Sequence, residues 1–567
     1  LNTVNHASTL HQDDSQAAWV HAGQDLVVSG GNGLSIPKAA DISAGGDIKD
    51  LAYTGQHFRD SDVTRISAGG NFIGLAATSR TDGLIQVGGL GELQVEAGRN
   101  LDLSVSGGIE TSGKLSNAAL PEQGAHIRVM AGARKQVDVE ALASQFMTDE
   151  STRADLVTFV QKTLKVSDLS YEQALDHFRG MSMDHQVSFA DQYVFTPRFV
   201  ATYVQSDQAG VPAPYQQAWV AAAKAAGVKA TDYTSIRFRQ FKDDVVMKEV
   251  QRLGDVVSGI ALSDNAAENA RREAARQVVW DQIARAIDLA GLGAGFKFSG
   301  DIDLAGSKIY TQGKGDRTHG GIDLFAPGGQ VLVGLSTSTE KDKLEAATRG
   351  LVAYAGGSIR SLSSGDFQVN SQKAFVVGSG DLLVYTGQGD IDAGRGSNTD
   401  VTVPPPVAVK DPLTGVVTFV SPAVTTGSGI GILKNQDGSS EGAVSLLAPP
   451  PHEVRALDAY IQGPTVNLPG KVLGADNVQG PVKGQAPPPT VTVNLSVNSG
   501  LGTEAAAGEA VAAEAASRGK AKERGSLLTV ELLGLGDQDN APGAGDPVPS
   551  KAKDDETKDC PKKNCVR

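Results

Sequence analysis

A spacing of 23 or 24 residues between glycine–Asp or glycine–Asn pairs recurs in two distant parts of the chain. Asp47 and Asn71 lie 24 residues apart in equivalent contexts, and Asp366 and Asp390 repeat the same interval. Short apolar or alternating stretches of about five residues separate these pairs. A period in the low twenties with several short strands per repeat is typical of a three-sided coil that stacks on its neighbours about 4.8 Å away. We therefore predict a right-handed parallel β-helix.

The residue types suit this interpretation. Glycine can turn the chain at a corner with positive φ, and Asp or Asn side chains can accept hydrogen bonds from nearby backbone N–H groups. The apolar residues between corners are expected to point inward and stack: Ile48, Phe72, Leu101, Leu103, Ile302, Leu304, Ile359, Phe367, Val369, Leu382 and Ile391. An ordinary β-sandwich remains the alternative, because regular turn signals suit it too.

Size and composition favour a fold that grows in one dimension. The chain has 567 residues, more than the roughly 250–300 that one compact core supports. It contains 67 glycines and only 5% aromatic residues. Its net charge is −14 and its basic residues are interspersed with acidic ones, which argues against a nucleic-acid partner. No signal peptide or bilayer-spanning run is recognisable, and the opening residues resemble the middle of a repeat, so we expect a fragment of a longer protein.

A segment with a helical sequence pattern separates the two regions of repeats. Residues 134–296 carry apolar residues at spacings of three and four and are rich in helix formers, which predicts an α-helical insertion. Ser170 followed by Gln173 indicates a capping box, Ser263 is expected to open the last helix, and Gly291 follows its end. We expect the β-helix to continue after the insertion as one stack.

These patterns divide the chain into five segments. We predict a parallel β-helix at 1–133, the helical insertion at 134–296, the continued β-helix at 297–395, irregular coils with a Pro-bounded hairpin at 396–496, and a flexible tail at 497–567.

No motif indicates catalysis, and we predict neither a cofactor nor a metal. Two G-D-I-D stretches, with Asp301, Asp303, Asp390 and Asp392, could hold calcium, but the glycine-rich nonapeptide of calcium rolls is missing, so corner hydrogen bonding is preferred. His177 and His185 are interpreted as ordinary surface or core residues. The Lys-Gly-Asp triplet at 314–316 resembles an integrin-type tripeptide and is interpreted as a chance occurrence.

The tail holds the two cysteines of the chain, in the closing stretch CPKKNC. Cys560 and Cys565 lack the further ligands of a zinc site and the C-x-x-C spacing of a redox motif. We interpret them as a disulfide, with idle thiols as the alternative. A disulfide that closes so short a loop stabilises a fold little. It would, however, make a compact, positively charged end that cannot pass through a narrow pore. The disulfide also implies an oxidising compartment.

Upstream of the cysteines, four consecutive small residues could enter a narrow protease groove. They are Ala505, Ala506, Ala507 and Gly508, within TEAAAGEAVAAEAASRGKAKERG. A simple Ala-rich linker or a nascent helix is the alternative interpretation.

Residues 20–480 resemble the filamentous haemagglutinin family of two-partner secretion exoproteins. The resemblance rests on the repeat grammar, the GADNVQG stretch at 474–480 and the intercalated helices. It implies a surface adhesin secreted through a dedicated outer-membrane transporter. A subset of that family also has a similar tail, in which a cysteine hook holds the adhesin in its transporter and a periplasmic cysteine protease, governed by cyclic-di-GMP, cuts at an Ala-Ala-Gly site.

The resemblance therefore implies a biofilm or cell adhesin stalk at the outer membrane, with its tail in the periplasm. Cys560 and Cys565 would form the hook, and cleavage near Ala505 to Gly508 would release the filament into the medium. Exopolysaccharide or another cell would be the ligand. A freely secreted haemagglutinin and a β-helix polysaccharide-degrading enzyme are the alternative functions.

Overall fold

The computed structural model describes residues 11–28, 33–74, 83–103, 106–115, 117, 119–205, 212–263, 265–312, 320–335, 349–354, 356–394, 407–410, 417–420, 428–435 and 438–485. The chain divides into two units, Leu1–Pro489 and Thr490–Arg567, and every described residue belongs to the first unit.

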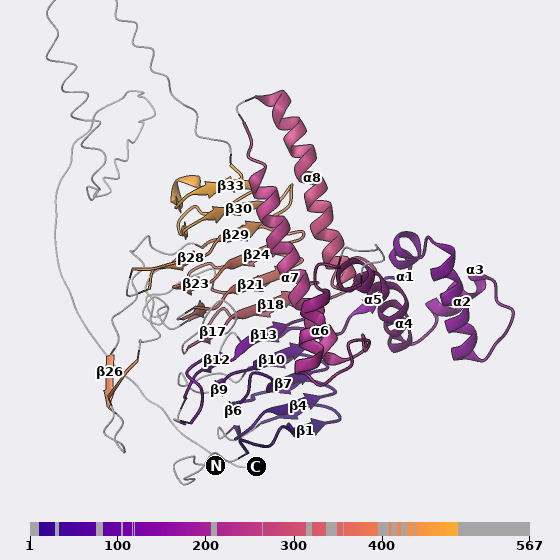
Figure 1. The fold of residues 1–567 in the computed structure, drawn as a ribbon, viewed down its shortest axis with the longest axis horizontal. Helices are drawn as coiled ribbons and strands as arrows, with labels where there is room; N and C mark the ends of the chain where they lie inside the picture. The colour runs from indigo at the N-terminus through magenta and orange to yellow at the C-terminus, as the bar shows by residue number, and fades with distance from the viewer. Residues whose placement is uncertain are drawn as a thin grey trace, which may run out of the picture. The chain divides into compact units, whose positions relative to one another are not determined.

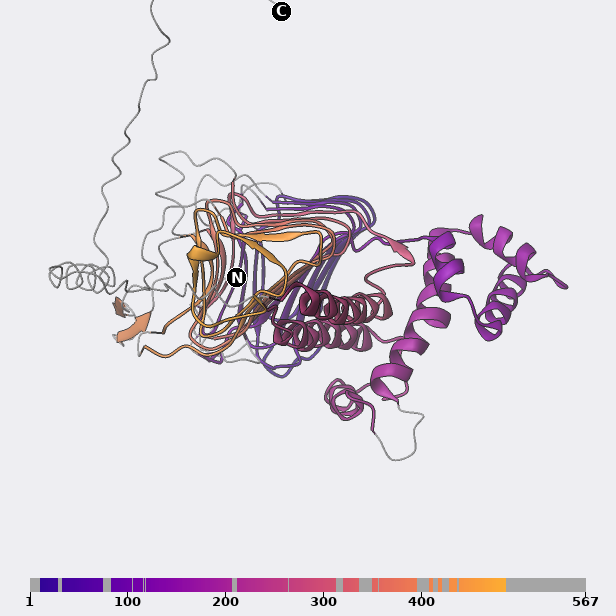
Figure 2. The ribbon, with the colours of Figure 1, turned by 90° about the horizontal axis from the view of Figure 1, so that it is seen from above.

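Three long parallel sheets form the sides of a β-helix, so the fold class predicted from the repeat is confirmed (Figures 1 and 2). The first sheet consists of eleven strands: β1 (Ala18–Ala22), β4 (Ala40–Ala44), β7 (Val63–Ala68), β10 (Glu92–Ala97), β13 (His126–Met130), β18 (Ile322–Ala326), β21 (Ile359–Ser363), β24 (Leu382–Thr386), β29 (Val444–Leu447), β32 (Val466–Asn467) and β35 (Val482–Lys483).

The other two sheets have ten strands each. The second consists of β2 (Leu26–Val27), β5 (Ile48–Lys49), β8 (Phe72–Ile73), β11 (Leu101–Asp102), β16 (Ile302–Asp303), β19 (Val331–Leu332), β22 (Phe367–Gln368), β25 (Ile391–Asp392), β30 (Glu453–Arg455) and β33 (Lys471–Leu473). The third consists of β3 (Leu34–Ile36), β6 (Tyr53–His57), β9 (Ile85–Gly89), β12 (Ile109–Ser112), β17 (Lys308–Thr311), β20 (Gly350–Ala353), β23 (Lys373–Val377), β28 (Gly429–Leu433), β31 (Tyr460–Gln462) and β34 (Val478–Gln479).

The core runs along the axis of the three sheets. All eleven residues predicted to point inward belong to it and are fully buried. Equivalent positions pair in register, as in Ile48 with Phe72 and Phe367 with Ile391. The register continues across the insertion, since Leu101 pairs with Ile302. The two β parts are thus one stack, as the sequence predicted.

Glycine and Asx residues build the corners. A Cβ atom on Gly45 would lie 2.4 Å from the carbonyl oxygen of Gly23 in the preceding coil, so only glycine allows this close approach. The Oδ1 atom of Asp47 accepts a hydrogen bond of 2.8 Å from the backbone N–H of Asn71, one coil later. Side chains at these corners therefore satisfy backbone donors that the short strands leave unpaired.

The helical insertion leaves the stack between β13 and β16. Its helices are α1 (Val139–Ala141), α2 (Glu150–Leu164), α3 (Tyr171–Arg179), α4 (Met183–Phe189), α5 (Thr196–Phe199), α6 (Gln216–Ala225), α7 (Ile236–Gly259) and α8 (Ala266–Leu289), with π-helical turns at Leu142–Phe146, Ala190–Phe195 and Val200–Val204. The antiparallel strands β14 (Gln136–Val137) and β15 (Phe296–Lys297) close its base.

Helix starts largely follow the sequence signals. The predicted capping box of Ser170 and Gln173 is present at α3, and Gly291 follows α8 with a φ of 76°. The expectation that Ser263 opens the last helix is wrong. Asn265 caps α8 instead, because its side chain accepts from the backbone N–H groups of Ala267 and Glu268.

Helices α7 and α8 pack against the outer face of the first sheet (Figure 1). There β18 and β24 are buried on both faces, whereas β4, which these helices do not cover, alternates between buried and half-buried residues. The outward side chains Phe325, Leu362, Leu383, Tyr385 and Leu447 join residues of α7 and α8 in one apolar cluster. The hydrophobic effect thus holds the helical pair on the stack.

Residues 396–496, expected as a hairpin and irregular coils, contain both a hairpin and regular coils where the structure describes them. Strands β26 (Val407–Lys410) and β27 (Val417–Val420) pair antiparallel. From β28 to β35 the chain adds strands to all three sheets. The strands there are only two to five residues long, so an alternating pattern has little length in which to show.

Candidate functional site beneath the helical insertion

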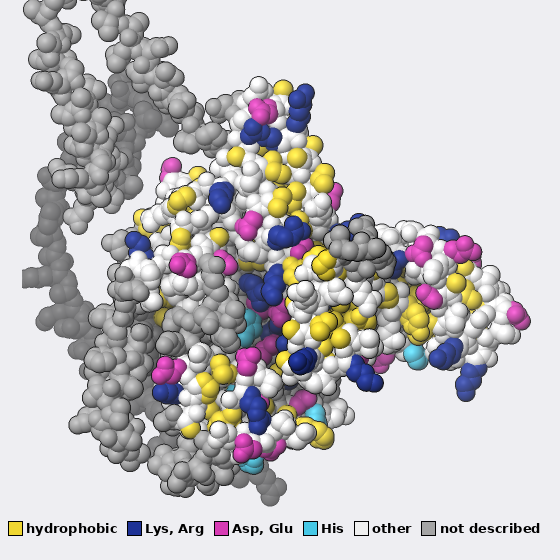
Figure 3. Space-filling model, viewed as in Figure 1, with side chains coloured by type: hydrophobic (Ala, Val, Ile, Leu, Met, Phe, Trp, Pro, Cys, Tyr) yellow, Lys and Arg dark blue, Asp and Glu magenta, His cyan; other side chains and the backbone are white. Residues whose placement is uncertain are grey.

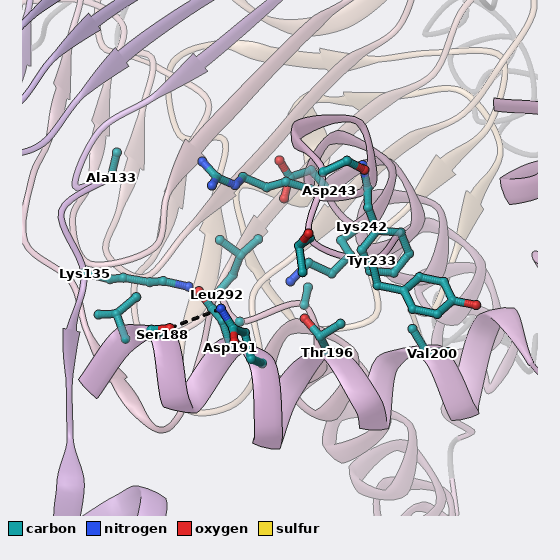
Figure 4. Close-up of a pocket in the computed structure, with 18 of the residues that line it drawn as sticks. Ala133, Lys135, Ser188, Asp191, Thr196, Val200, Tyr233, Lys242, Asp243 and Leu292 are labelled. Carbon is teal, nitrogen blue, oxygen red and sulfur yellow. Dashed lines mark hydrogen bonds and ion pairs between the residues drawn. The ribbon is translucent and has the colours of Figure 1, made fainter. Parts of the chain in front are cut away.

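A large cavity of about 1050 Å³ lies where the helical insertion meets the stack. Its walls come from β13 and the loop after it, from α4 and the turn Ala190–Phe195, from the start of α7, and from the residues after α8. Figure 4 shows the side chains that line it, and Figure 3 shows basic and acidic side chains gathered at the same junction. We define this cavity as the insertion pocket.

Lys242 is the unusual residue of the insertion pocket. It lies on α7, and only 7% of it is exposed. Its side chain extends from the helix into the space facing Asp191 and Lys135 (Figure 4). Within the described part of the chain, its ammonium group has no hydrogen bond or ion pair. Burial lowers the pKa of Lys242, while the charge of Asp191 acts in the opposite direction.

The nearby acids already have partners. Lys135 Nζ lies 2.7 Å from Asp191 Oδ1 and 4.1 Å from the centre of the Phe296 ring. Asp243 lies 3.3 Å from Arg128. Burial raises the pKa of Asp243 to about 6, although Arg128 opposes this. Neither carboxylate forms an ion pair or hydrogen bond with Lys242, although the charges of both act to raise its pKa.

Beside the insertion pocket, a buried ionic network joins α7 to the first sheet. Arg128 on β13 contacts Glu92 at 2.8 Å and Asp244 at 2.8 Å. Asp323 on β18 is fully buried and receives two hydrogen bonds from Arg360, one of them 2.6 Å long, and a third from His126 at 2.9 Å. Burial would raise the pKa of Asp323, but Arg360 and His126 hold it well below its usual range.

This network fixes the wall of the insertion pocket. A buried ion pair of this kind contributes little net stability, yet it strongly disfavours any arrangement that leaves one charge alone. The network therefore holds α7, and with it Lys242, in one register against the sheet.

The predicted sites of the tail, and the Lys-Gly-Asp triplet far upstream of it, lie outside the described residues. This applies to Cys560 and Cys565, to Ala505, Ala506, Ala507 and Gly508, and to the Lys-Gly-Asp triplet at 314–316. The structure therefore neither joins nor separates the two cysteines.

The four aspartates of the G-D-I-D stretches are corner residues. Each accepts a backbone hydrogen bond: Asp301 from Gln330 at 2.9 Å, Asp303 from Ala305 at 2.9 Å, Asp390 from Glu453 at 3.0 Å and Asp392 from Gly394 at 2.8 Å. Corner hydrogen bonding is thus confirmed for all four. Among the described residues no group of three His, Cys, Asp or Glu side chains is placed to hold a metal.

His177 and His185 lie on the surface of the insertion, in agreement with their interpretation as ordinary residues. The Nδ1 atom of His185 lies 3.0 Å from the hydroxyl of Ser182, three residues earlier in the chain. The insertion pocket itself was not predicted from the sequence. The sequence holds one signal of it, which is the position of Lys242 on α7. Lys242 lies four residues from both Phe238 and Val246, and residues at this spacing share a helix face, so the lysine falls on a face whose neighbours are buried apolar residues.

Comparison with known families adds an identification. Residues 379–487 match the model of a family described as filamentous haemagglutinin family outer membrane protein. The chain carries a filamentous haemagglutinin family region. This region spans β24 to β35, the coils on which parts of α7 and α8 rest. The match confirms the family resemblance for these residues, which cover a part of the range 20–480 over which the sequence indicated it, and the matched region ends before the cysteine-containing tail.

No curated protein and no solved structure matches the chain significantly. Within the described ranges, no helix has the length and apolar character needed to cross a bilayer.

Proposed function

We propose that this chain is the stalk of a surface adhesin, retained at the outer membrane by a disulfide hook between Cys560 and Cys565. In this proposal an outer-membrane two-partner secretion transporter passes the chain, and the stack projects from the cell. The tail remains on the periplasmic side, and the hook prevents its escape. A periplasmic cysteine protease that cuts between Ala505 and Gly508 releases the filament.

The family region carries the proposal. A filamentous haemagglutinin outer membrane protein region, 109 residues long, ends at residue 487, next to the segment with the predicted cleavage site and hook. The stack itself supports an adhesin, because a β-helix separates its two ends by one strand spacing per coil and makes a long, narrow support. The proposal gives the chain a structural role rather than a catalytic one, with exopolysaccharide or another cell as the ligand.

The tail is long enough for this arrangement. From Gln485, the last described residue of the stack, to Ala505 there are 20 residues, which reach about 66 Å when extended. That length exceeds the roughly 40–45 Å of a bilayer with its headgroups. The cleavage site could therefore lie in the periplasm while the stack stays outside the cell.

Cell fractionation and immunoblotting of culture supernatants test the proposal. The cysteine variant Cys560→Ser/Cys565→Ser should be shed into the medium, because nothing then holds the tail. The cleavage-site variant Ala507→Arg/Gly508→Arg should stay on the cell under conditions that release the wild type. Ala512→Arg/Ala513→Arg, a few residues downstream, is the matched control and should behave like the wild type.

Two results would contradict the proposal. If neither the cysteine nor the cleavage-site variant changes the distribution, the tail is a linker without a retention role. If the wild type is found only in the medium, the chain is a freely secreted exoprotein.

A further inference from the structure

We propose that the insertion pocket binds an amphipathic carboxylate, whose acidic group pairs with Lys242 and whose apolar body lies along the inner walls. This inference concerns a part of the chain that the adhesin proposal does not use, and it does not depend on the tail.

The charge of Lys242 is not matched by an ion pair with a described residue. Lys242 as a residue is only 7% exposed, and a charged ammonium group in such a place is costly unless a partner or solvent in the cavity neutralises it. Its acidic neighbours Asp191 and Asp243 are engaged by Lys135 and Arg128. A ligand carboxylate is therefore the partner that the pocket lacks.

The rim of the insertion pocket carries further basic side chains. Arg134 and Arg239 line the insertion pocket and are exposed, and neither side chain forms an ion pair with a described residue. Glu96, another lining residue, is already paired with Arg65 at 2.6 Å. Asp184 is an exposed lining acid without an ion pair to a described residue, and it offsets one of these charges. With Lys242, the cations that lack a partner still outnumber it, which favours the entry of an anion.

The inner walls of the insertion pocket are largely apolar. Val187 on α4, Val200, Leu292 after α8 and Phe298 contribute apolar surface to the cavity, and Tyr233 contributes an aromatic ring. A cavity of about 1050 Å³ is at the upper end of the range for ligand pockets and is too large for a bare inorganic anion. The combination of one buried cation and apolar walls fits a carboxylate with an apolar body.

Calorimetric titration of the full chain with decanoate tests the inference. Decanol supplies the same apolar body without the charge, and glucuronate supplies a carboxylate on a polar body. Decanoate should bind at least about tenfold more tightly than either, since both halves of the pocket contribute. Equal affinity for decanoate and decanol would refute the role of Lys242, and a preference for glucuronate would refute that of the walls.

Variants separate the pocket from unspecific adsorption. Lys242→Met should reduce the affinity for decanoate to that for decanol, and Lys248→Met, an exposed lysine on the same helix, should change neither. Val187→Trp places a bulky ring against the apolar wall of the cavity and should weaken the binding of both probes. Unchanged decanoate affinity in Lys242→Met, with the fold verified by circular dichroism, would overturn the proposal, and so would the absence of any binding to the wild type.

A pH series gives an independent measurement. The charged groups that face Lys242 are Asp191, Lys135, Asp243 and Arg239. Because burial lowers the pKa of Lys242, its ammonium loses the proton at a lower pH than an exposed lysine does. Decanoate affinity should therefore weaken with rising pH before an exposed lysine would lose its proton, and decanol affinity should not. Parallel pH profiles of the two probes would contradict the pairing.

Discussion

At the scale of single residues, buried polar side chains make the stability of the stack depend on pH. His57 at the end of β6 is fully buried, with Nδ1 2.7 Å from the Leu90 carbonyl oxygen and Nε2 2.8 Å from Thr64 Oγ1. Nδ1 thus donates to the carbonyl, and Nε2 accepts from the hydroxyl. Burial lowers the pKa of His57 to about 4, so the folded chain keeps this ring neutral.

The pH dependence of stability follows from this depressed pKa. The unfolded chain binds the proton at a pKa near 6.5, and the folded chain only near 4. The stabilisation is therefore complete above pH 6.5 and is lost as the pH falls from 6.5 to 4, by up to about 3 kcal/mol. Urea unfolding of His57→Gln at several pH values should lack this loss, and the exposed control His185→Gln should keep it. A similar slope in both variants would contradict the assignment.

Asp323 represents the opposite case, a carboxylate that must stay charged. Replacement by Asn leaves Arg360 and His126 without their buried partner and should lower the free energy of unfolding by about 3–5 kcal/mol. Chemical denaturation measures this loss. Asp176→Asn removes an exposed acid that pairs with Arg179, and should have little effect. Equal effects of the two substitutions would show that the network does not hold its charges as described.

The sequence predicts the role of a single residue well where that role recurs in every coil. Inward apolar residues and corner aspartates return at the same interval in successive coils, so the same assignment can be checked in each of them. Lys242 and Asp323 were not predicted, because their roles depend on α7 meeting β13, β18 and β21, strands that all lie far from this helix in the sequence. No local pattern marks such a meeting.

At the scale of elements, the contact between α7 and the first sheet depends on close approach. Gly254 lies in α7, and a Cβ atom there would come within 2.6 Å of Leu447 Cδ1 on β29. Gly259, at the end of the same helix, has nothing within 4 Å of such an atom. The two glycines therefore form a matched pair for testing the packing.

Gly254→Val should lower the free energy of unfolding by about 1–3 kcal/mol, because the added methyl groups force α7 away from the sheet. Gly259→Val adds the same side chain at the end of the helix without a clash and should have little effect. Denaturant titration, with near-ultraviolet circular dichroism of Trp280 in the same apolar cluster, measures both. Equal stability of the two variants would place α7 differently on the stack.

The sequence indicated the helical insertion, but not where its helices lie. Periodicity and capping residues follow from local physics, so the capping box at α3 was predictable. The N-cap of α8 was misassigned by two residues, because Ser263 and Asn265 both suit a cap. That α7 and α8 cover the stack could have been inferred only from the apolar residues on the outer as well as the inner face of β18, β24 and β29.

At the scale of the whole described unit, the insertion is a loop between adjacent coils. Its first and last strands pair directly, with Val137 opposite Phe296, and the coils before and after it are already in register. The stack should therefore form without residues 138–295. The outer face of the first sheet would then expose the apolar cluster that α7 and α8 cover.

A chain in which an Asn-Gly turn replaces residues 138–295 should keep its β-type circular dichroism but associate and bind anilinonaphthalene sulfonate. The cause is the exposed patch of Phe325, Leu362, Leu383 and Leu447. Substitution of these four residues by Thr should restore a monomer in light-scattering measurements. A shortened chain that stays monomeric with the patch intact would contradict this account, and so would loss of the β signal.

The helices across the coils also determine how this stack would respond to tension. In a plain β-helix each coil touches only its neighbours, so a pull along the axis can peel them off one after another. Here Arg276 of α8 donates to the carbonyl oxygens of Pro469 at 2.9 Å and of Gly484, and Gln251 of α7 reaches Ser445 at 3.0 Å. The same two helices pack on Phe325 and Leu362. They act as a splint, because the spanned coils can separate only when the splint slides off all of them together.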